Sequence, residues 1–461
     1  MIRLHWLEWL PILVYLLLLL YLGLKHTPVP SQSEENFIVG GRKLTLPAFV
    51  MTLVTTWYGG ILGVGEFNYL YGIASWVVFG LPYYMFAIAF ALFFAEKIQQ
   101  SRLLTIPDQF FKHYGTLPGY AATLIAFFIT LPAPYILMIG FLVYLVTGWP
   151  LSISIIVGTA FSSLYVLTGG FRAVVRTDRL QFLLMYGGFL VMFGMLLHKY
   201  GGISFLTTHL PATHFNPSGG LSPWVILSWF LIALWTFIDP GFYQRCYAAQ
   251  TPEIARKGIL LSVGLWFIFD LLTTTVGLFA RALLTDVQPV LAYPMLSHMA
   301  LPPLLSGLFF TALFATIMST TDSYTLLGAI TLGHDFLSRL PRLRHVSRVL
   351  LLRWGLLGTT GLSIALALLL PSVVQLWYVV GSLCIPSLLM PLLAIYYPRF
   401  KRSPRITLVN LVGAFLLSGL WFAIGWVTSP SGAGLTYPLN VQPMFPGLIF
   451  SLLLYLLAPR K

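Results

Sequence analysis

The residues best suited to chemistry are oxygen-bearing side chains inside an otherwise apolar stretch. From Thr316 to Ser323 the chain carries five hydroxyls and one carboxylate, Asp322. Thr316, Ser319 and Thr320 are spaced at i, i+3 and i+4, so on a helix they share one face. Hard cations take oxygen ligands. The run predicts a site for a small cation such as Na⁺, with hydroxyls that bond to their own backbone or join neighbouring helices as the alternative.

Acidic residues are scarce in this chain, yet several lie in or beside apolar stretches. Ionisable side chains are costly at membrane depth and are usually functional there. The alternative for each is a structural pairing with a helix terminus or a nearby arginine. For Asp178 such a pairing is available, because arginines surround it in the sequence; the roles of Glu66 and Asp270 stay open. The five acids concerned are Glu66, Asp178, Asp239, Asp270 and Asp322.

The composition predicts that lipid surrounds these residues. Hydrophobic residues make up 58% of the 461 and charged residues only 8%, whereas soluble domains carry about 25% charged residues. Continuous apolar runs of about 20 residues suit membrane-crossing helices rather than a barrel. We expect an all-α polytopic membrane protein with about 13 transmembrane helices, at 6–24, 47–70, 73–96, 118–146, 150–168, 174–197, 223–247, 257–284, 302–336, 347–370, 372–397, 404–428 and 443–458.

Two of the expected spans are interrupted by helix-breaking residues. The second contains Gly59 and Gly60, and the seventh contains Asp239-Pro-Gly. Broken helices at matching places in two halves indicate a transporter's central site; two unrelated kinks are the alternative. Each break lies in the first of five successive spans. Because five is odd, the two sets of five spans must have opposite orientations in the membrane. The expected parts are a helix and loop at 1–35, inverted repeats at 36–200 and 201–400, and two helices at 401–461.

The net charge of +13 is explained by the loops rather than by a nucleic acid partner. Lysines and arginines gather in alternate loops, and the positive-inside rule places those loops in the cytoplasm. The N-terminus is then outside and the C-terminus cytoplasmic, in a cell (inner) membrane. The two cysteines lie far apart in sequence and imply neither a disulfide framework nor a metal cluster.

Five motifs in consistent order give the chain a family resemblance. They are 36–42 (Asn-Phe-Ile-Val-Gly-Gly-Arg), the broken helix at 52–65, 165–181 with its Thr-Asp-Arg-Leu-Gln ending, 239–245 (Asp-Pro-Gly-Phe-Tyr-Gln-Arg) and 318–323 (Met-Ser-Thr-Thr-Asp-Ser). With them the chain resembles the sodium:solute symporter family over about residues 36–400. The resemblance implies a leucine-transporter-like core of five plus five helices, one extra N-terminal helix and two C-terminal ones.

The resemblance also implies which atoms hold Na⁺, the co-transported ion. By position they are the carbonyls of Thr55, Tyr58 and Thr316 and the hydroxyls of Ser319 and Thr320. Some members hold a second ion, which here would use Asp178, Asp322 and Ser323, with Ser319 shared. Two departures leave that second site open: Arg176 stands where many members have Trp, and Asp322 replaces a hydroxyl.

The expected solute pocket lies beside the two breaks. Its predicted residues are Trp57, Gly59, Gly60, Trp235, Phe237 and Asp239. The Thr-x-Trp-x-Gly-Gly pattern resembles choline-type members, in which aromatic faces hold a quaternary ammonium. Packing is the alternative role for Trp57, and helix capping for Asp239. The solute is a small organic molecule: choline-like, an amino acid, a sugar acid or an organic acid.

These features predict Na⁺-coupled symport by alternating access rather than an enzyme. The nearest alternative is a proton-coupled symporter of the same fold, in which Asp178, Asp239 or Asp322 would titrate. A membrane-embedded enzyme is disfavoured because no His-Glu-x-x-His pattern is present. A sensor or channel that retains the fold is the third alternative.

Overall fold

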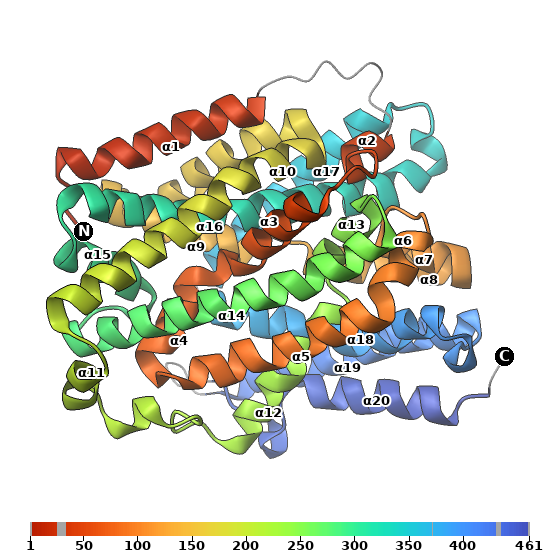
Figure 1. The fold of residues 1–461 in the computed structure, drawn as a ribbon. Helices are drawn as coiled ribbons and strands as arrows, with labels where there is room; N and C mark the ends of the chain where they lie inside the picture. The colour runs from red at the N-terminus through yellow and green to blue at the C-terminus, as the bar shows by residue number, and fades with distance from the viewer. Residues whose placement is uncertain (1, 25–33, 371, 430–434, 460–461) are drawn as a thin grey trace.

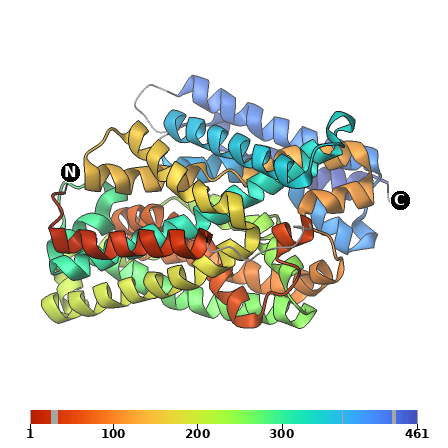
Figure 2. The ribbon, with the colours of Figure 1, turned by 90° about the horizontal axis from the view of Figure 1, so that it is seen from above.

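The protein is a bundle of helices that lie side by side along one main direction (Figure 1). The computed structural model describes residues 2–24, 34–370, 372–429 and 435–459. Within these ranges there is no strand, only an isolated parallel bridge between Leu44 and Ala249. The all-α class expected from composition is confirmed. The N- and C-terminal ends are drawn at opposite ends of the bundle (Figures 1 and 2).

The helical elements follow one another with short connections, and their bounds are: α1 Trp6–Leu24, α2 Glu34–Val39, α3 Leu46–Trp57, η1 Tyr58–Gly60, α4 Ile61–Tyr71, η2 Trp76–Gly80, α5 Leu81–Phe90, η3 Ala91–Ala95, α6 Glu96–Gln100, α7 Ile106–Tyr114, α8 Thr116–Ile129, α9 Ala133–Thr147, α10 Leu151–Tyr200, α11 Ile203–His209, η4 Ala212–Phe215, α12 Pro223–Ile232, η5 Ala233–Phe237, α13 Pro240–Ala248, α14 Pro252–Leu283, η6 Pro289–Leu291, α15 Ala292–Ala300, α16 Pro303–Ile330, η7 Thr331–Phe336, η8 Leu337–Arg339, η9 Pro341–Leu343, α17 Arg348–Leu369, α18 Val373–Tyr396, η10 Pro398–Phe400, α19 Pro404–Thr428, η11 Pro438–Asn440 and α20 Met444–Leu457.

Eleven helices in the described ranges are long and apolar enough to cross a membrane. Two further apolar helices, Leu151–Val166 and Met444–Leu457, are shorter and correspond to expected spans. Large apolar side chains face outward, as at Leu17, Leu183 and Leu357, which are 67%, 65% and 64% exposed. Such surfaces are stable against lipid rather than water. The polytopic membrane architecture is confirmed, and the count of 13 stays a prediction.

The two expected spans at 150–168 and 174–197 both lie in α10, which consists of two helices, Leu151–Val166 and Gly169–Tyr200, that meet at a kink at Gly170. This residue has φ 55°, in the left-handed region that favours glycine. A Cβ there would also lie 2.8 Å from the carbonyl oxygen of Phe37. The bend therefore depends on glycine twice, once for the backbone angle and once for the space that α2 occupies.

α16 forms the centre of the bundle. Every residue from Phe309 to Ile330 is buried, and the helix packs against α1, α3, α9, α10 and α17. A helix enclosed on all sides has no lipid-facing stripe, so its hydroxyl run points into protein. The cation-site candidates on α16 are therefore buried within the protein.

Candidate functional site

The first broken span brings its backbone against α16. α3 ends at Trp57 and a 3₁₀ turn, η1, leads into α4. A Cβ added at Gly59 would lie 2.1 Å from the Cβ of Thr320, and one at Gly60 would lie 2.2 Å from the Trp377 ring. The glycine pair thus allows α16 and α18 to approach this turn at distances that any side chain would prevent.

Oxygen atoms from the break and from α16 meet at this contact. The Thr320 hydroxyl lies 2.7 Å from the carbonyl oxygen of Thr56 and 3.3 Å from that of Thr55. The Thr316 hydroxyl instead donates to the carbonyl of Ala312, 2.7 Å away on its own helix. All these residues are buried. The structure thus places Thr320 against the backbone of Thr55 and Thr56, whereas Thr316 bonds within α16.

Ser319 connects this oxygen cluster to a buried carboxylate. Its hydroxyl donates to Asp178 over 2.6 Å, and Thr52 donates to the other oxygen of the same carboxylate. Tyr58, the remaining predicted Na⁺ ligand, begins η1 and its phenol donates to the carbonyl of Trp266, 3.0 Å away. Asp178 is thus part of the α3–α10–α16 contact rather than an ion pair with the arginines beside it in sequence.

A buried arginine accompanies Asp178. The Arg245 guanidinium is fully buried and donates to the hydroxyls of Thr52, Thr56 and Ser323, over 3.1, 2.8 and 2.8 Å. Thr52 bridges the two charges, because it accepts from Arg245 and donates to Asp178. Such a paired and hydrogen-bonded arrangement is what makes a buried charge tolerable.

Asp322 is bound from a different direction. The Ser162 hydroxyl, 2.6 Å away, and the Tyr165 phenol both donate to its carboxylate from α10. Ser323, its neighbour in sequence, bonds to Arg245 and Thr56 instead. The three residues named for a second ion, Asp178, Asp322 and Ser323, therefore already have protein partners.

The second broken span is capped by its own acid. η5 ends at Phe237, and Asp239 accepts from the backbone N–H of Phe242 over 3.0 Å at the start of α13. Its other oxygen accepts from Trp235 Nε1 over 3.0 Å and from the Tyr324 phenol over 2.5 Å. Asp239 is therefore a helix cap, the alternative role considered for it, and it is 2% exposed.

A cavity of about 110 Å³ lies between the two breaks. Of the predicted solute-binding residues, Trp57, Gly60 and Trp235 line it, whereas Gly59, Phe237 and Asp239 do not. Most of its lining is aromatic, and its one acid, Asp270, accepts a hydrogen bond from Tyr84. The lining residues are Thr56, Trp57, Tyr58, Gly60, Val64, Phe79, Tyr83, Tyr84, Tyr135, Trp229, Ile232, Trp235, Trp266, Asp270, Tyr324 and Trp377.

Several cavity and site residues were not given a role from the sequence. Arg245 stands in a recognised motif, and Tyr324 directly follows the hydroxyl run, so both carried a positional signal. Trp266, Trp229 and Trp377 are aromatic residues in apolar helices, with nothing in the sequence to separate them from packing residues. Their convergence arises only from how α12, α14 and α18 pack.

The chain is similar to known proteins over most of its length. A model of the sodium:solute symporter family matches residues 37–406. Among similar curated proteins, the sodium/pantothenate symporter of Escherichia coli is 26% identical over 98% of this chain and 96% of its own. The human high affinity choline transporter 1 is 24% identical over 88% of this chain and 75% of its own.

A solved structure has the same fold. It is a Na⁺-coupled sialic acid symporter in a substrate-bound, outward-open state, with a TM-score of 0.79 and 16% identity over 99% of both chains. The arrangement of helices described above is therefore that of a known transporter architecture.

Proposed function

The chain belongs to the sodium:solute symporter family, and we propose that it carries a small organic cation, such as a quaternary ammonium, into the cell. It is a Na⁺-coupled secondary transporter of a small organic solute, with Na⁺ as the co-transported ion. The cation class of the solute is our proposal, and it rests on the lining of the cavity.

The proposal rests on the lining of the cavity, which is mostly aromatic and includes one acid and no basic residue. Eleven of its sixteen lining residues are Phe, Tyr or Trp, and none is Lys, Arg or His. Aromatic faces attract cations, and desolvation strengthens that attraction. A carboxylate solute would find no charged donor among these residues, whereas Asp270 would complement a positive charge.

The Na⁺ site proposed from the sequence fits the contact between η1 and α16. Its atoms are the carbonyls of Thr55, Tyr58 and Thr316 and the hydroxyls of Ser319 and Thr320. The 2.7 Å approach of Thr320 to the backbone of the broken helix supports this assignment, and all-oxygen ligation suits a hard cation. Binding there would tie α16 to the break that borders the solute cavity.

We propose that a single Na⁺ accompanies each solute. The second-ion candidates Asp178 and Ser323 lie beside Arg245, whose guanidinium donates to Ser323 over 2.8 Å. A cation added there would meet a like charge, and repulsion at about 4 Å costs several kcal/mol at protein dielectric values. Arg245 thus supplies the positive charge that a second ion would bring.

The orientation and the mechanism belong to the same proposal. The N-terminus is placed outside and the C-terminus in the cytoplasm of the inner membrane, because basic residues gather in alternate loops. The parts 36–200 and 201–400 are proposed as inverted repeats that rock against each other for alternating access. The Leu44–Ala249 bridge supports opposite orientations of the two broken spans, because it joins the start of the first span to the end of the second.

An organic anion is the second candidate, since the matching pantothenate and sialic acid symporters carry such names. The test is thermal stability of the purified protein with choline, lactate or pantothenate, in Na⁺ or in an inert cation. A ligand bound only by the folded state raises stability with occupancy. We expect a choline shift that requires Na⁺ and that Ser319→Ala removes, while Thr321→Ala keeps it, because Thr321 bonds to its own helix.

A separate substitution tests whether the cavity prefers a positively charged solute. Asp270→Asn should weaken choline binding at least about tenfold and leave 3,3-dimethylbutanol, the uncharged isostere, unaffected. A Na⁺-dependent shift by lactate or pantothenate with none by choline would instead establish the anion. Shifts that respond to pH and not to Na⁺ would refute the ion assignment.

A further inference from the structure

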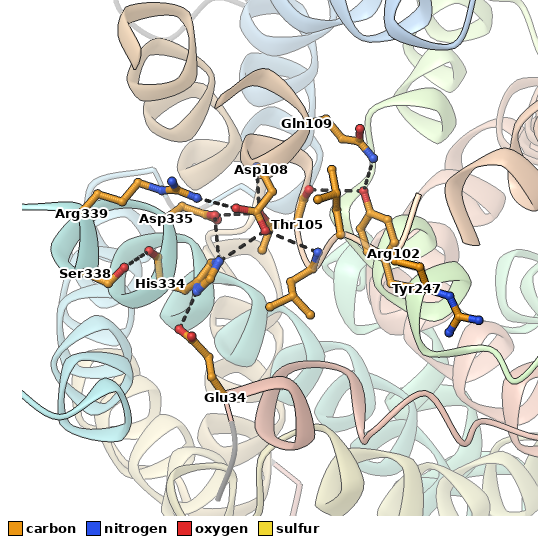
Figure 3. A network of polar contacts seen from close by, with 12 residues as sticks. Glu34, Arg102, Thr105, Asp108, Gln109, Tyr247, His334, Asp335, Ser338 and Arg339 are labelled. Carbon is orange, nitrogen blue, oxygen red and sulfur yellow. Dashed lines mark hydrogen bonds and ion pairs between the residues drawn. The ribbon is translucent and has the colours of Figure 1, made fainter. Parts of the chain in front are cut away.

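A polar cluster whose residues lie outside the solute cavity joins four elements at one end of the bundle. Glu34 begins α2, Asp108 lies in the first turn of α7, and His334 and Asp335 lie in η7, the continuation of α16. Arg339 follows in η8. Figure 3 shows the side chains of Asp108, Asp335 and Arg339 pointing toward one another, with His334 between Asp108 and Glu34.

The ligand atoms around His334 lie close to the spacing between ligands of one metal ion. Its Nε2 lies 3.4 Å from Oδ2 of Asp108 and 3.8 Å from Oδ1 of Asp335. One ligand atom from each of the three residues lies within 4.8 Å of the others. Two ligands at about 2.1 Å from a tetrahedral Zn²⁺ are themselves about 3.4 Å apart. A single ion between the three groups would need only small side-chain movements.

The surrounding groups orient these three ligands. Nδ1 of His334 lies 2.5 Å from Oε1 of Glu34, the carboxylate–histidine contact that usually fixes the ring of a metal-ligating histidine. Arg339 donates to Oδ1 of Asp108 and leaves Oδ2 facing the imidazole. The Thr105 hydroxyl donates to Oδ1 of Asp335 over 2.6 Å. Each ligand is thus held by a further partner.

One oxygen in the cluster has no partner. Asp335 is fully buried, and its Oδ2 makes no hydrogen bond with any described residue. A buried carboxylate oxygen without a partner costs free energy that a bound cation would recover. The charges of the metal-bound form agree: once the imidazole has lost its proton to bind the ion, the carboxylates of Glu34, Asp108 and Asp335 are balanced by Arg339 together with one divalent ion.

We propose that Asp108, His334 and Asp335 form a binding site for a divalent transition cation such as Zn²⁺, with Glu34 orienting the histidine. Mixed nitrogen and oxygen ligands suit this class of ion, whereas Mg²⁺ and Ca²⁺ take oxygen ligands. The ion has a route to the site, because the His334 and Asp108 side chains are 12% and 14% exposed. When bound, it fixes α7 to η7 and, through Glu34, to α2.

The test is calorimetric titration of Zn²⁺ into protein purified without a histidine tag. We expect one saturable site, weakened more than about a hundredfold by His334→Gln or Asp335→Asn. Glu34→Gln should weaken it about tenfold, as expected for loss of an orienting group. His345→Gln is the matched control, because this exposed histidine lies outside the cluster, and it should leave the affinity unchanged.

X-ray absorption of the Zn²⁺-loaded wild-type protein keeps the proposal testable if a variant fails to fold. We expect a first shell of nitrogen and oxygen with an imidazole signature. Sulfur ligation, which would implicate Cys246 or Cys384, overturns the assignment. So does the absence of saturable binding, or equal binding by the wild-type protein and the folded His334→Gln and Asp335→Asn variants.

Discussion

The two broken spans interrupt a membrane helix by different physical means. The first replaces one α-helical turn by the 3₁₀ turn η1 and has glycines where neighbouring helices come close. The second ends η5 at Phe237 and restarts at Pro240, with Asp239 as cap. The first break therefore depends on residues without side chains, and the second on a charged side chain.

This difference indicates that the two breaks have different roles. At the first, Gly59 has no side chain, so α16 can come close enough for its Thr320 hydroxyl to bond to a backbone oxygen. At the second, the Asp239 carboxylate satisfies the start of α13 and gathers Trp235 and Tyr324 beside the cavity. We infer that the first break serves mainly the ion and the second mainly the shape of the solute site.

The Gly59→Ala substitution tests the role of the first break and has the largest expected effect. Its Cβ would lie 2.1 Å from the Cβ of Thr320, so α16 and the Na⁺ ligands proposed on it must move away from the proposed ligands Thr55 and Tyr58 in the first broken span. We expect Na⁺-driven uptake into proteoliposomes to fall more than about a hundredfold, because small misplacements at a site cost this much. Gly187→Ala is the control, since nothing lies within 4 Å of that position. Normal uptake by Gly59→Ala would contradict the role given to the first break.

Substitution of Asp239 tests the second break. Loss of a cap costs about 0.5–2 kcal/mol, and Asp239→Ala also leaves Trp235 and Tyr324 without an acceptor. We expect a loss of about 2–4 kcal/mol in the free energy of unfolding, measured by denaturation in detergent. Asp239→Asn, which can still cap, should lose less than half as much. Equal losses in both variants would mean that the charge matters rather than the cap.

Much of this arrangement could be predicted from the sequence, because it depends on local chemistry. Apolar runs set the helices, with predicted 118–146 observed as Thr116–Thr147 and predicted 257–284 as Pro252–Leu283. The positions of both breaks followed from Gly and Pro-Gly. The expected division between the spans 150–168 and 174–197 corresponds to the kink at Gly170, where non-helical backbone angles separate the two helices of α10.

Contacts between distant residues could not be predicted in the same way. Arg245 bonds to Thr52, 193 positions away, and His334 bonds to Glu34, 300 positions away. No local pattern encodes such pairs, since they depend on how whole helices pack. The lining of the cavity was the least predictable part for this reason, because Trp266, Trp229 and Trp377 come from three separate helices.

The dependence of uptake on Na⁺ concentration tests how many ions accompany the solute. If Arg245 occupies the place of a second ion, initial uptake should rise with Na⁺ concentration with a Hill coefficient of about 1. Ser319→Ala should raise the half-saturating Na⁺ concentration more than about tenfold, whereas Ser323→Ala should change it less than about threefold. A coefficient near 2 that Ser323→Ala lowers to 1 would establish a second ion beside Arg245.

The smallest expected effect concerns acid stability at the end of the bundle that holds Asp108. Burial alone would raise the pKa of this carboxyl, but its hydrogen bond to His334 and the charges of His334 and Arg339 outweigh burial and lower it. The unfolded chain therefore binds the proton at a higher pH than the folded protein does. The stabilising contribution is complete above the ordinary Asp value of about 3.9 and is lost as the pH falls through the lowered pKa.

Thermal unfolding with a chelator present should accordingly show a loss of stability below about pH 4. The loss should be smaller in Asp108→Asn. Glu34 contributes with the same sign, because its hydrogen bond to His334 and the charge of that ring also outweigh burial and lower its pKa; a residual loss is therefore expected in the variant. An identical pH profile in both proteins would mean that His334 and Arg339 do not stabilise the ionised form of Asp108. This end of the bundle would then be held by packing, as the first break is, rather than by charge.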